Sequence, residues 1–203
     1  MVVDMRDMED RLLQRRIVAL GHIDEKEASR VGLNLLRLQL ASSDPAYLVI
    51  SSTGGSLDAA MSLCDTIQYA FEMPVHALVD GHCASAATFI LLACKERLAM
   101  PHCRFLIHSG MVSGISLRTD DVTERKVERL LQETKKTTEM VIDFYADKLK
   151  KSRSEIKELI ARGDEQFDNY LSAAEALEIG LITSIVNSKL GLFPPPPPQQ
   201  QSG

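Results

Sequence analysis

Residues 75–92 read VHALVDGHCASAATFILL, and they are the most informative part of the chain. It opens with an apolar run over 75–79, continues through a turn of small residues that contains Ser85, and ends in a strongly apolar segment. This order is typical of a buried strand that leads into a buried helix. Two interpretations of Ser85 are open: it caps the helix, or its hydroxyl is a nucleophile supported by the helix N-terminus.

A second short apolar run, Phe105-Leu-Ile-His108, ends on a histidine. A serine hydroxyl is a weak nucleophile until a neighbouring base takes its proton. Ser85 at a helix start and His108 at a strand end are therefore parts that a serine hydrolase needs. The turn around Ser85 differs from the Gly-x-Ser-x-Gly turn of many other hydrolases.

Strand and helix patterns alternate along the rest of the chain. Apolar runs predict strands over 17–20, 47–50, 75–79, 97–100, 104–108 and 182–186. Helices are predicted over 25–41, 57–71, 154–162 and 173–179, and a further apolar helix follows Ser85. Asp24 with Glu27, and Ser172 with Glu175, are spaced as capping boxes. This order predicts an α/β fold with a mostly parallel sheet and helices packed on it. A second row of Leu33, Leu36 and Leu40 predicts that the helix over 25–41 is buried around much of its circumference.

One helical pattern is unusually long and runs from about Thr119 to Lys150. A straight helix of that length would reach about 48 Å, which is more than a domain of this size can cover. We expect its apolar stripe to pack against a second subunit. A kinked or broken pair of helices is the alternative.

We expect three parts in the chain: an N-terminal segment over 1–16, one domain over 17–190, and a disordered tail over 191–203 that contains five consecutive prolines. The net charge of −5 leaves no basic surface for nucleic acid. No window has the length and apolarity of a membrane span, and the charged N-terminus lacks the apolar centre of a signal peptide. These features predict a cytoplasmic protein.

The cysteines and histidines predict neither a metal site nor a cofactor, because no pair has the usual ligand spacing. A reducing compartment makes free thiols the expectation for Cys64, Cys83, Cys94 and Cys103. Cys83 lies two residues from Ser85, so it is either a reactive neighbour or, as we expect, a small buried thiol.

Several segments, taken in order over about Asp7–Val186, resemble the Clp protease proteolytic subunit, ClpP. They are Ile50-Ser-Ser-Thr-Gly-Gly-Ser56, Ala60-Met-Ser-Leu-Cys-Asp-Thr-Ile67, Gly81-His-Cys-Ala-Ser-Ala86, Pro101-His-Cys-Arg-Phe-Leu-Ile-His108 and Phe167-Asp-Asn-Tyr-Leu-Ser-Ala-Ala-Glu-Ala-Leu-Glu-Ile-Gly180.

The resemblance implies a ClpP/crotonase-like superhelix of ββα units with a projecting handle helix, here the pattern over 119–150. It implies a serine endopeptidase with Ser85 as nucleophile, His108 as general base and Asp168 as the acid that orients the histidine. It also implies that the N–H groups of Gly55 and Ala86 form the oxyanion hole.

The same resemblance implies how the protein assembles and what it acts on. Family members stack two seven-membered rings through the handle helix and enclose their active sites in a chamber. An AAA+ unfoldase feeds them unfolded polypeptides, and short peptides also enter. Neither nucleic acid nor a membrane is implied as a partner.

Departures from the family pattern keep other functions open. Thr53, Ser56, Ala86-Ala87 and Ser109-Gly110 replace usual neighbours of the site, the handle is longer, and the N-terminal segment is short. A catalytically inactive or ATPase-independent ring subunit is the main alternative. A crotonase-type acyl-CoA enzyme would not need Ser85 and His108. A membrane-associated serine–lysine peptidase would use Lys95 as its base.

Overall fold

The computed structural model describes residues 5–109, 124–165 and 170–187. The chain divides into a larger unit, Met1–Leu106 with Leu171–Gly203, and a smaller unit, Ile107–Tyr170. The elements follow in the order α1 (Met5–Gln14), β1 (Ile17–Leu20), α2 (Glu25–Ala41), β2 (Ala46–Ser52), α3 (Leu57–Asp65), the π-helical turn η1 (Thr66–Ala70), β3 (Val75–Ala84), α4 (Ala86–Ala93), β4 (Arg97–Ala99), β5 (Arg104–Leu106), α5 (Glu124–Leu149), α6 (Arg153–Glu165), β6 (Leu171–Ser172), α7 (Ala173–Glu178) and β7 (Ser184–Ile185).

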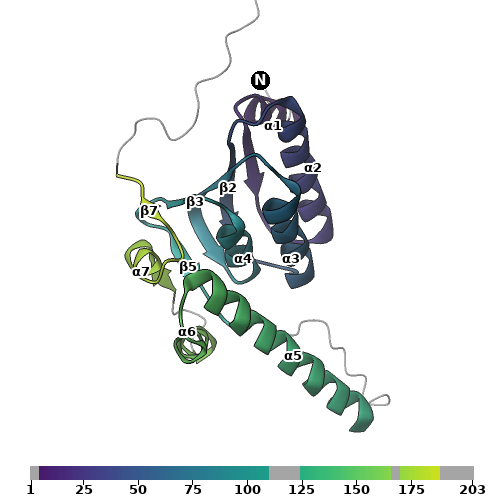
Figure 1. Ribbon diagram of the computed structural model, residues 1–203, viewed down its shortest axis with the longest axis vertical. Coiled ribbons are helices and arrows are strands. Elements are labelled where there is room, and N and C mark those ends of the chain that lie inside the picture. The colour runs from purple at the N-terminus through teal and green to yellow at the C-terminus, as the bar shows by residue number, and fades with distance from the viewer. Residues whose placement is uncertain (1–4, 110–123, 166–169, 188–203) are drawn as a thin grey trace, which may run out of the picture. The chain divides into compact units, whose positions relative to one another are not determined.

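The larger unit is built on a mostly parallel sheet with strand order β1-β2-β3-β4-β7. Strand β5 pairs in parallel with β3, and β6 pairs with β5 in the antiparallel direction. Helices α2, α3 and α4 lie beside the strands (Figure 1). Their inward side chains are fully buried and include Val31, Leu35, Ala60, Ile90 and Leu91. The predicted α/β fold with a mostly parallel sheet is confirmed.

Strand β3 is the centre of this sheet and changes its partner midway. Its first half pairs with β4, and its last residues, up to Ala84, pair with β5. Gly81 lies at the change with a φ of 114°, and its N–H donates to the Cys103 thiol at 3.3 Å. The sequence predicted a strand only over 75–79. This prediction is wrong about the end of the strand. The strand continues through polar residues to Ala84 because β5 supplies hydrogen-bond partners for that part of the backbone.

Helix α2 begins where the sequence predicts. The Asp24 carboxylate accepts from the Glu27 N–H at 2.7 Å. The reciprocal half of the predicted capping box is wrong, because the Glu27 carboxylate accepts from the Gly21 N–H at 3.0 Å and pairs with Arg30. The hydrogen bond from Arg30 lowers the pKa of the Glu27 carboxyl.

The predicted burial of α2 around much of its circumference is wrong for the single chain. Leu33, Leu36 and Leu40 are 59%, 42% and 80% exposed, whereas Val31 and Leu35 are fully buried. The helix packs against β1 and α3 with one face, so the second leucine row has no cover from its own unit.

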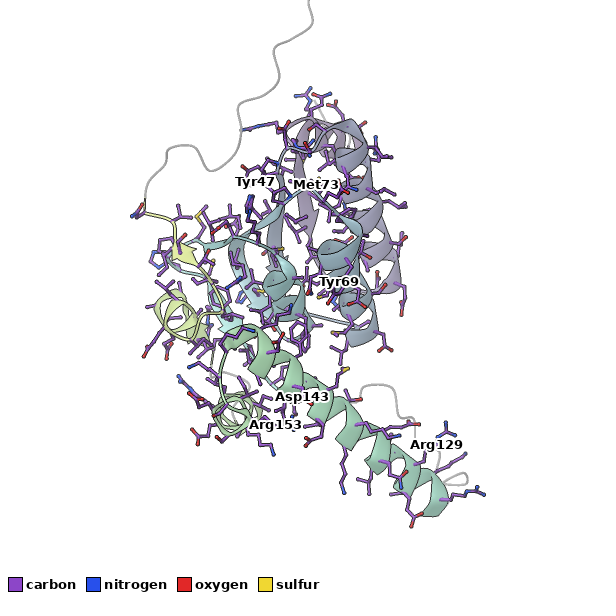
Figure 2. The ribbon with its side chains drawn as sticks, viewed as in Figure 1. Tyr47, Tyr69, Met73, Arg129, Asp143 and Arg153 are labelled. Atoms are coloured by element: carbon purple, nitrogen blue, oxygen red, sulfur yellow. The ribbon has the colours of Figure 1, made fainter. Side chains whose placement is uncertain are left out.

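The smaller unit consists of α5 and α6 in its described part. Helix α5 is continuous over 26 residues, which argues against a broken pair of helices between Glu124 and Leu149. Arg153, at the start of α6, forms ion pairs with Glu139 and Asp143 of α5, and Figure 2 shows the Asp143 and Arg153 side chains between the two helices. Apolar residues at the C-terminal end of α5 are buried, including Val141, Ile142, Tyr145 and Leu149.

The C-terminal end of the larger unit follows the predicted local signals. Ser172 and Glu175 form a complete capping box at the start of α7. Gly180 has a φ of 82° just after that helix, as expected of a C-terminal glycine. No helix in the described part of the chain is both long and apolar enough to span a membrane.

Candidate active site

Ser85 lies between β3 and α4 in a strained backbone conformation. Its φ is 55° and its ψ is −129°. Residues other than glycine rarely adopt a positive φ. The conformation costs about 1–3 kcal/mol and persists only where the surrounding structure fixes it. From Cys83 to Leu92 every residue is buried except Ser85, which is partly exposed. The turn therefore presents this one side chain from an otherwise buried segment.

The hydroxyl of Ser85 does not cap the helix that it precedes. Ser85 occupies the N-cap position of α4, but its side chain makes no capping hydrogen bond. The capping interpretation is therefore wrong for the hydroxyl. The backbone of Ser85 is bonded instead: its N–H donates to the Leu106 carbonyl at 2.8 Å, and its carbonyl accepts from the Thr88 N–H at 3.0 Å.

A two-glycine segment packs directly against this turn. Gly54 has a φ of 102°, and a Cβ placed there would lie 2.8 Å from both the Ser85 Cβ and the Ala84 carbonyl oxygen. The Gly54 N–H donates to the buried Ser52 hydroxyl at 3.1 Å. Sequence reasoning missed Gly54. The signal available was the Gly-Gly pair itself, which marks a close approach of two backbones.

Ile23 holds the backbone on both sides of Gly55 through hydrogen bonds to its two neighbours. The Ile23 N–H donates to the Gly54 carbonyl at 3.0 Å, and the Ser56 N–H donates to the Ile23 carbonyl at 2.8 Å. In this parallel bridge the groups of Gly55 itself point away from Ile23. A Cβ at Gly55 would lie 2.0 Å from the Ile23 carbonyl oxygen, so only glycine fits.

Two backbone donors near Ser85 are left unused within the described residues. They are the N–H groups of Gly55 and of Ala86, neither of which has an acceptor among residues 5–109, 124–165 and 170–187. The Ala86 N–H is the first of α4, where the helix leaves its N–H groups without internal acceptors. Such donors can bind an oxyanion or a carbonyl oxygen.

The other two predicted site residues are His108 and Asp168. His108 is partly exposed and belongs to the smaller unit, two residues after Leu106. Asp168 lies outside the described residues. The pairing of these two residues with Ser85 stays a prediction.

The thiols near the turn are buried and unreactive. All four cysteines are buried thiols. Burial raises the pKa of the Cys83 thiol well above its ordinary value and raises that of Cys94 to about 12. A thiol in this environment stays protonated and is a poor nucleophile. Cys83 is therefore the small buried thiol that the sequence favoured.

Comparisons with known proteins agree in pointing to one family. A family model described as Clp protease matches residues 3–189. The ATP-dependent Clp protease proteolytic subunit 1 of Chlamydia muridarum is 33% identical, and the match covers 93% of this chain and 95% of that protein. Proteolytic subunit 2 of Treponema denticola is 30% identical over 90% of this chain and 86% of its own.

A solved structure gives the same result. A mutant of ClpP1 from Listeria monocytogenes superimposes with a TM-score of 0.74 at 26% identity. The match covers 90% of this chain and 97% of that one. The fold expected from the resemblance is therefore confirmed.

Proposed function

The chain belongs to the Clp protease family, and from this premise we propose that it is a serine endopeptidase with Ser85 as its nucleophile. The family consists of proteolytic subunits, so peptidase activity is supported at that level. The single observation that carries the serine mechanism is the turn at Ser85. Ser85 is partly exposed, its hydroxyl makes no capping hydrogen bond, and its backbone has a strained positive φ.

The two unused N–H groups support the oxyanion hole of this proposal. Gly55 and Ala86 are the donors. Gly54, which has no Cβ, lets the two-glycine segment pack against the turn at Ser85. The N-terminus of α4 adds a partial positive charge at the same place. Removing one such donor typically lowers kcat by about a hundredfold or more.

The general base in the proposal is His108, oriented by Asp168. The Leu106 carbonyl accepts from the Ser85 N–H, and His108 follows Leu106 by only two residues. The placement of Asp168 rests on the family resemblance.

The chemistry is acyl transfer. His108 takes the Ser85 proton while Oγ attacks the carbonyl carbon of a peptide bond, and the N–H groups of Gly55 and Ala86 bind the oxyanion. His108 then gives the proton to the leaving amine. Water, deprotonated by His108, attacks the acyl-enzyme, and His108 then returns this proton to Ser85 Oγ as the bond to the second product breaks.

For the assembly we propose two stacked seven-membered rings with unfolded polypeptides and peptides as substrates. Family members form oligomers and pair with Clp ATPases, and an AAA+ unfoldase is the proposed partner here. Apolar residues exposed on the single chain support an oligomer. They are Leu33, Leu36 and Leu40 on α2, and Val127, Leu131 and Met140 on α5.

The test is hydrolysis of a short fluorogenic peptide and of an unfolded protein by Ser85→Ala and Ser172→Ala. Both serines occupy helix N-caps, but of these two hydroxyl groups only that of Ser172 makes a capping hydrogen bond. We expect Ser85→Ala to lose at least about a thousandfold in kcat, as removal of a nucleophile does, and Ser172→Ala to retain it. An assembled Ser85→Ala protein with the wild-type rate would refute the proposal. An assembled wild type that hydrolyses nothing would identify an inactive ring subunit.

A further inference from the structure

The carbonyl group of Ser85 is held twice by one residue. Thr88 donates to it through its backbone N–H at 3.0 Å and through its hydroxyl Oγ1 at 2.7 Å. Thr88 is completely buried. A buried hydroxyl bonded at this distance is shielded from competing water, so the bond fixes its acceptor firmly.

The acceptor carbonyl belongs to the same peptide unit as the Ala86 N–H. A trans peptide unit is planar, and its C=O and N–H point in opposite directions. Fixing the Ser85 carbonyl therefore fixes the direction of the Ala86 N–H. The hydroxyl of Thr88 acts on this donor without touching it.

The backbone at Ser85 needs such support because it is strained. A strained conformation persists when neighbouring groups determine it in more than one way. The Leu106 carbonyl holds the N–H side of Ser85 at 2.8 Å, and Thr88 holds the carbonyl side. The Thr88 N–H bond belongs to the backbone of the helix start, whereas the second bond depends on the threonine hydroxyl.

We propose that Thr88 is a positioning residue that aims the Ala86 N–H at the oxyanion of the transition state. This inference rests on the proposed function, in which Ala86 is an oxyanion donor. Valine at position 88 keeps the branched shape and the backbone bond but removes the hydroxyl. Serine keeps the hydroxyl and removes the methyl group.

The experiment measures kcat and KM for peptide hydrolysis by wild type, Thr88→Val, Thr88→Ser and Cys94→Ala, normalised to sites titrated with a fluorophosphonate. Cys94, the C-cap residue of α4, is a matched control, because its buried thiol donates to the Ile90 carbonyl at 3.4 Å at the opposite end of the helix from Ser85. Thr88→Ala serves as a second variant without the hydroxyl should valine prevent folding.

We expect Thr88→Val to lower kcat about fivefold, the effect of one hydrogen bond, with KM within about twofold because the oxyanion forms only in the transition state. Thr88→Ser should restore most of the rate, and Cys94→Ala should lower Tm without changing kcat. Wild-type kcat in folded Thr88→Val or Thr88→Ala would overturn the inference. So would a Thr88→Ser rate as low as that of Thr88→Val, which would show that shape matters and the hydroxyl does not. An inactive Ser85→Ala protein alongside either result would leave the proposed function standing.

Discussion

Ser85 and Ser172 of the larger unit each stand at the N-cap of a helix, and their hydroxyl groups are used in opposite ways. Ser172 has an ordinary extended backbone, with φ −71° and ψ 167°, and its hydroxyl accepts from the Glu175 N–H at 3.3 Å. Ser85 has a φ of 55°, and its hydroxyl makes no capping bond. The first arrangement stabilises a helix start. The second arrangement lacks this capping bond. The Ser85 hydroxyl is therefore available for the reaction that we propose.

The largest effect is expected from a change of Gly54, the glycine that packs against Ser85. Gly54→Ala would place a Cβ 2.8 Å from the Ser85 Cβ at a φ of 102°. We expect kcat to fall about a hundredfold, because a shift of about 1 Å in a catalytic group has that effect, and the free energy of unfolding to fall by about 3 kcal/mol. Peptide hydrolysis and denaturant titration measure both.

The matched control for this change is Gly180→Ala. Gly180 also has a positive φ, 82°, but a Cβ there would meet no atom within 4 Å. It should lose about 1 kcal/mol from backbone strain alone and keep its activity. Equal effects on kcat at the two glycines would show that contact with Ser85 is irrelevant.

The second test compares the stability effect of alanine at the two serines. Ser172→Ala should lower the free energy of unfolding by about 1 kcal/mol, because a true cap is lost. Ser85→Ala should change it by less than about 0.5 kcal/mol, since no capping bond exists to lose. Urea unfolding of both variants measures the difference. A loss at Ser85 as large as that at Ser172 would restore the capping interpretation.

The third test isolates backbone strain at Ser85. Ser85→Gly and Ser85→Ala both lack the hydroxyl, but glycine adopts a positive φ without strain. We expect the glycine variant to be the more stable of the two by about 0.5 kcal/mol, which is the relief of strain reduced by the greater entropy of glycine in the unfolded chain. Thermal unfolding of the pair decides the sign, and a less stable glycine variant contradicts the account.

The smallest expected effect is on the stability of the fold in acid, which His76 controls independently of the candidate site. Burial lowers the pKa of His76 from its ordinary 6.5, and its ring lies 5.7 Å from that of Tyr47. Below the ordinary value the unfolded chain binds the proton more readily, so stability falls as the pH drops through about 6.5. His76→Phe should reduce the fall in Tm between pH 7.5 and 5.5. An unchanged pH dependence of Tm in His76→Phe would exclude this histidine as its source.

The sequence predicted most of the fold because its signals are local. The apolar run of β1 lies where expected, and so do the caps at Asp24 and Ser172. The polar half of β3 was missed because its pairing depends on β5, which follows later in the chain. The leucine row on α2 was expected to be buried, but periodicity gives no information on whether a face is covered by the same chain or by another.

The candidate site was predictable only in its parts. Ser85 and His108 were recognised from their places at a helix start and at the end of an apolar run, and Asp168 came from the family resemblance alone. The strain at Ser85 could not be read from the sequence, because serine is not a residue that positive φ requires. Thr88 was missed because a threonine inside an apolar helix ordinarily indicates core packing.

Labelling with a fluorophosphonate probe shows whether Ser85 is the nucleophile. The probe reacts with an activated serine, and mass spectrometry of the digested protein locates it. We expect about one label for each chain, on Ser85, with Ser172 unlabelled and no label in Ser85→Ala. Folded, assembled protein that takes no label, or that takes it on another serine, would contradict the claim that the strained turn presents a nucleophile.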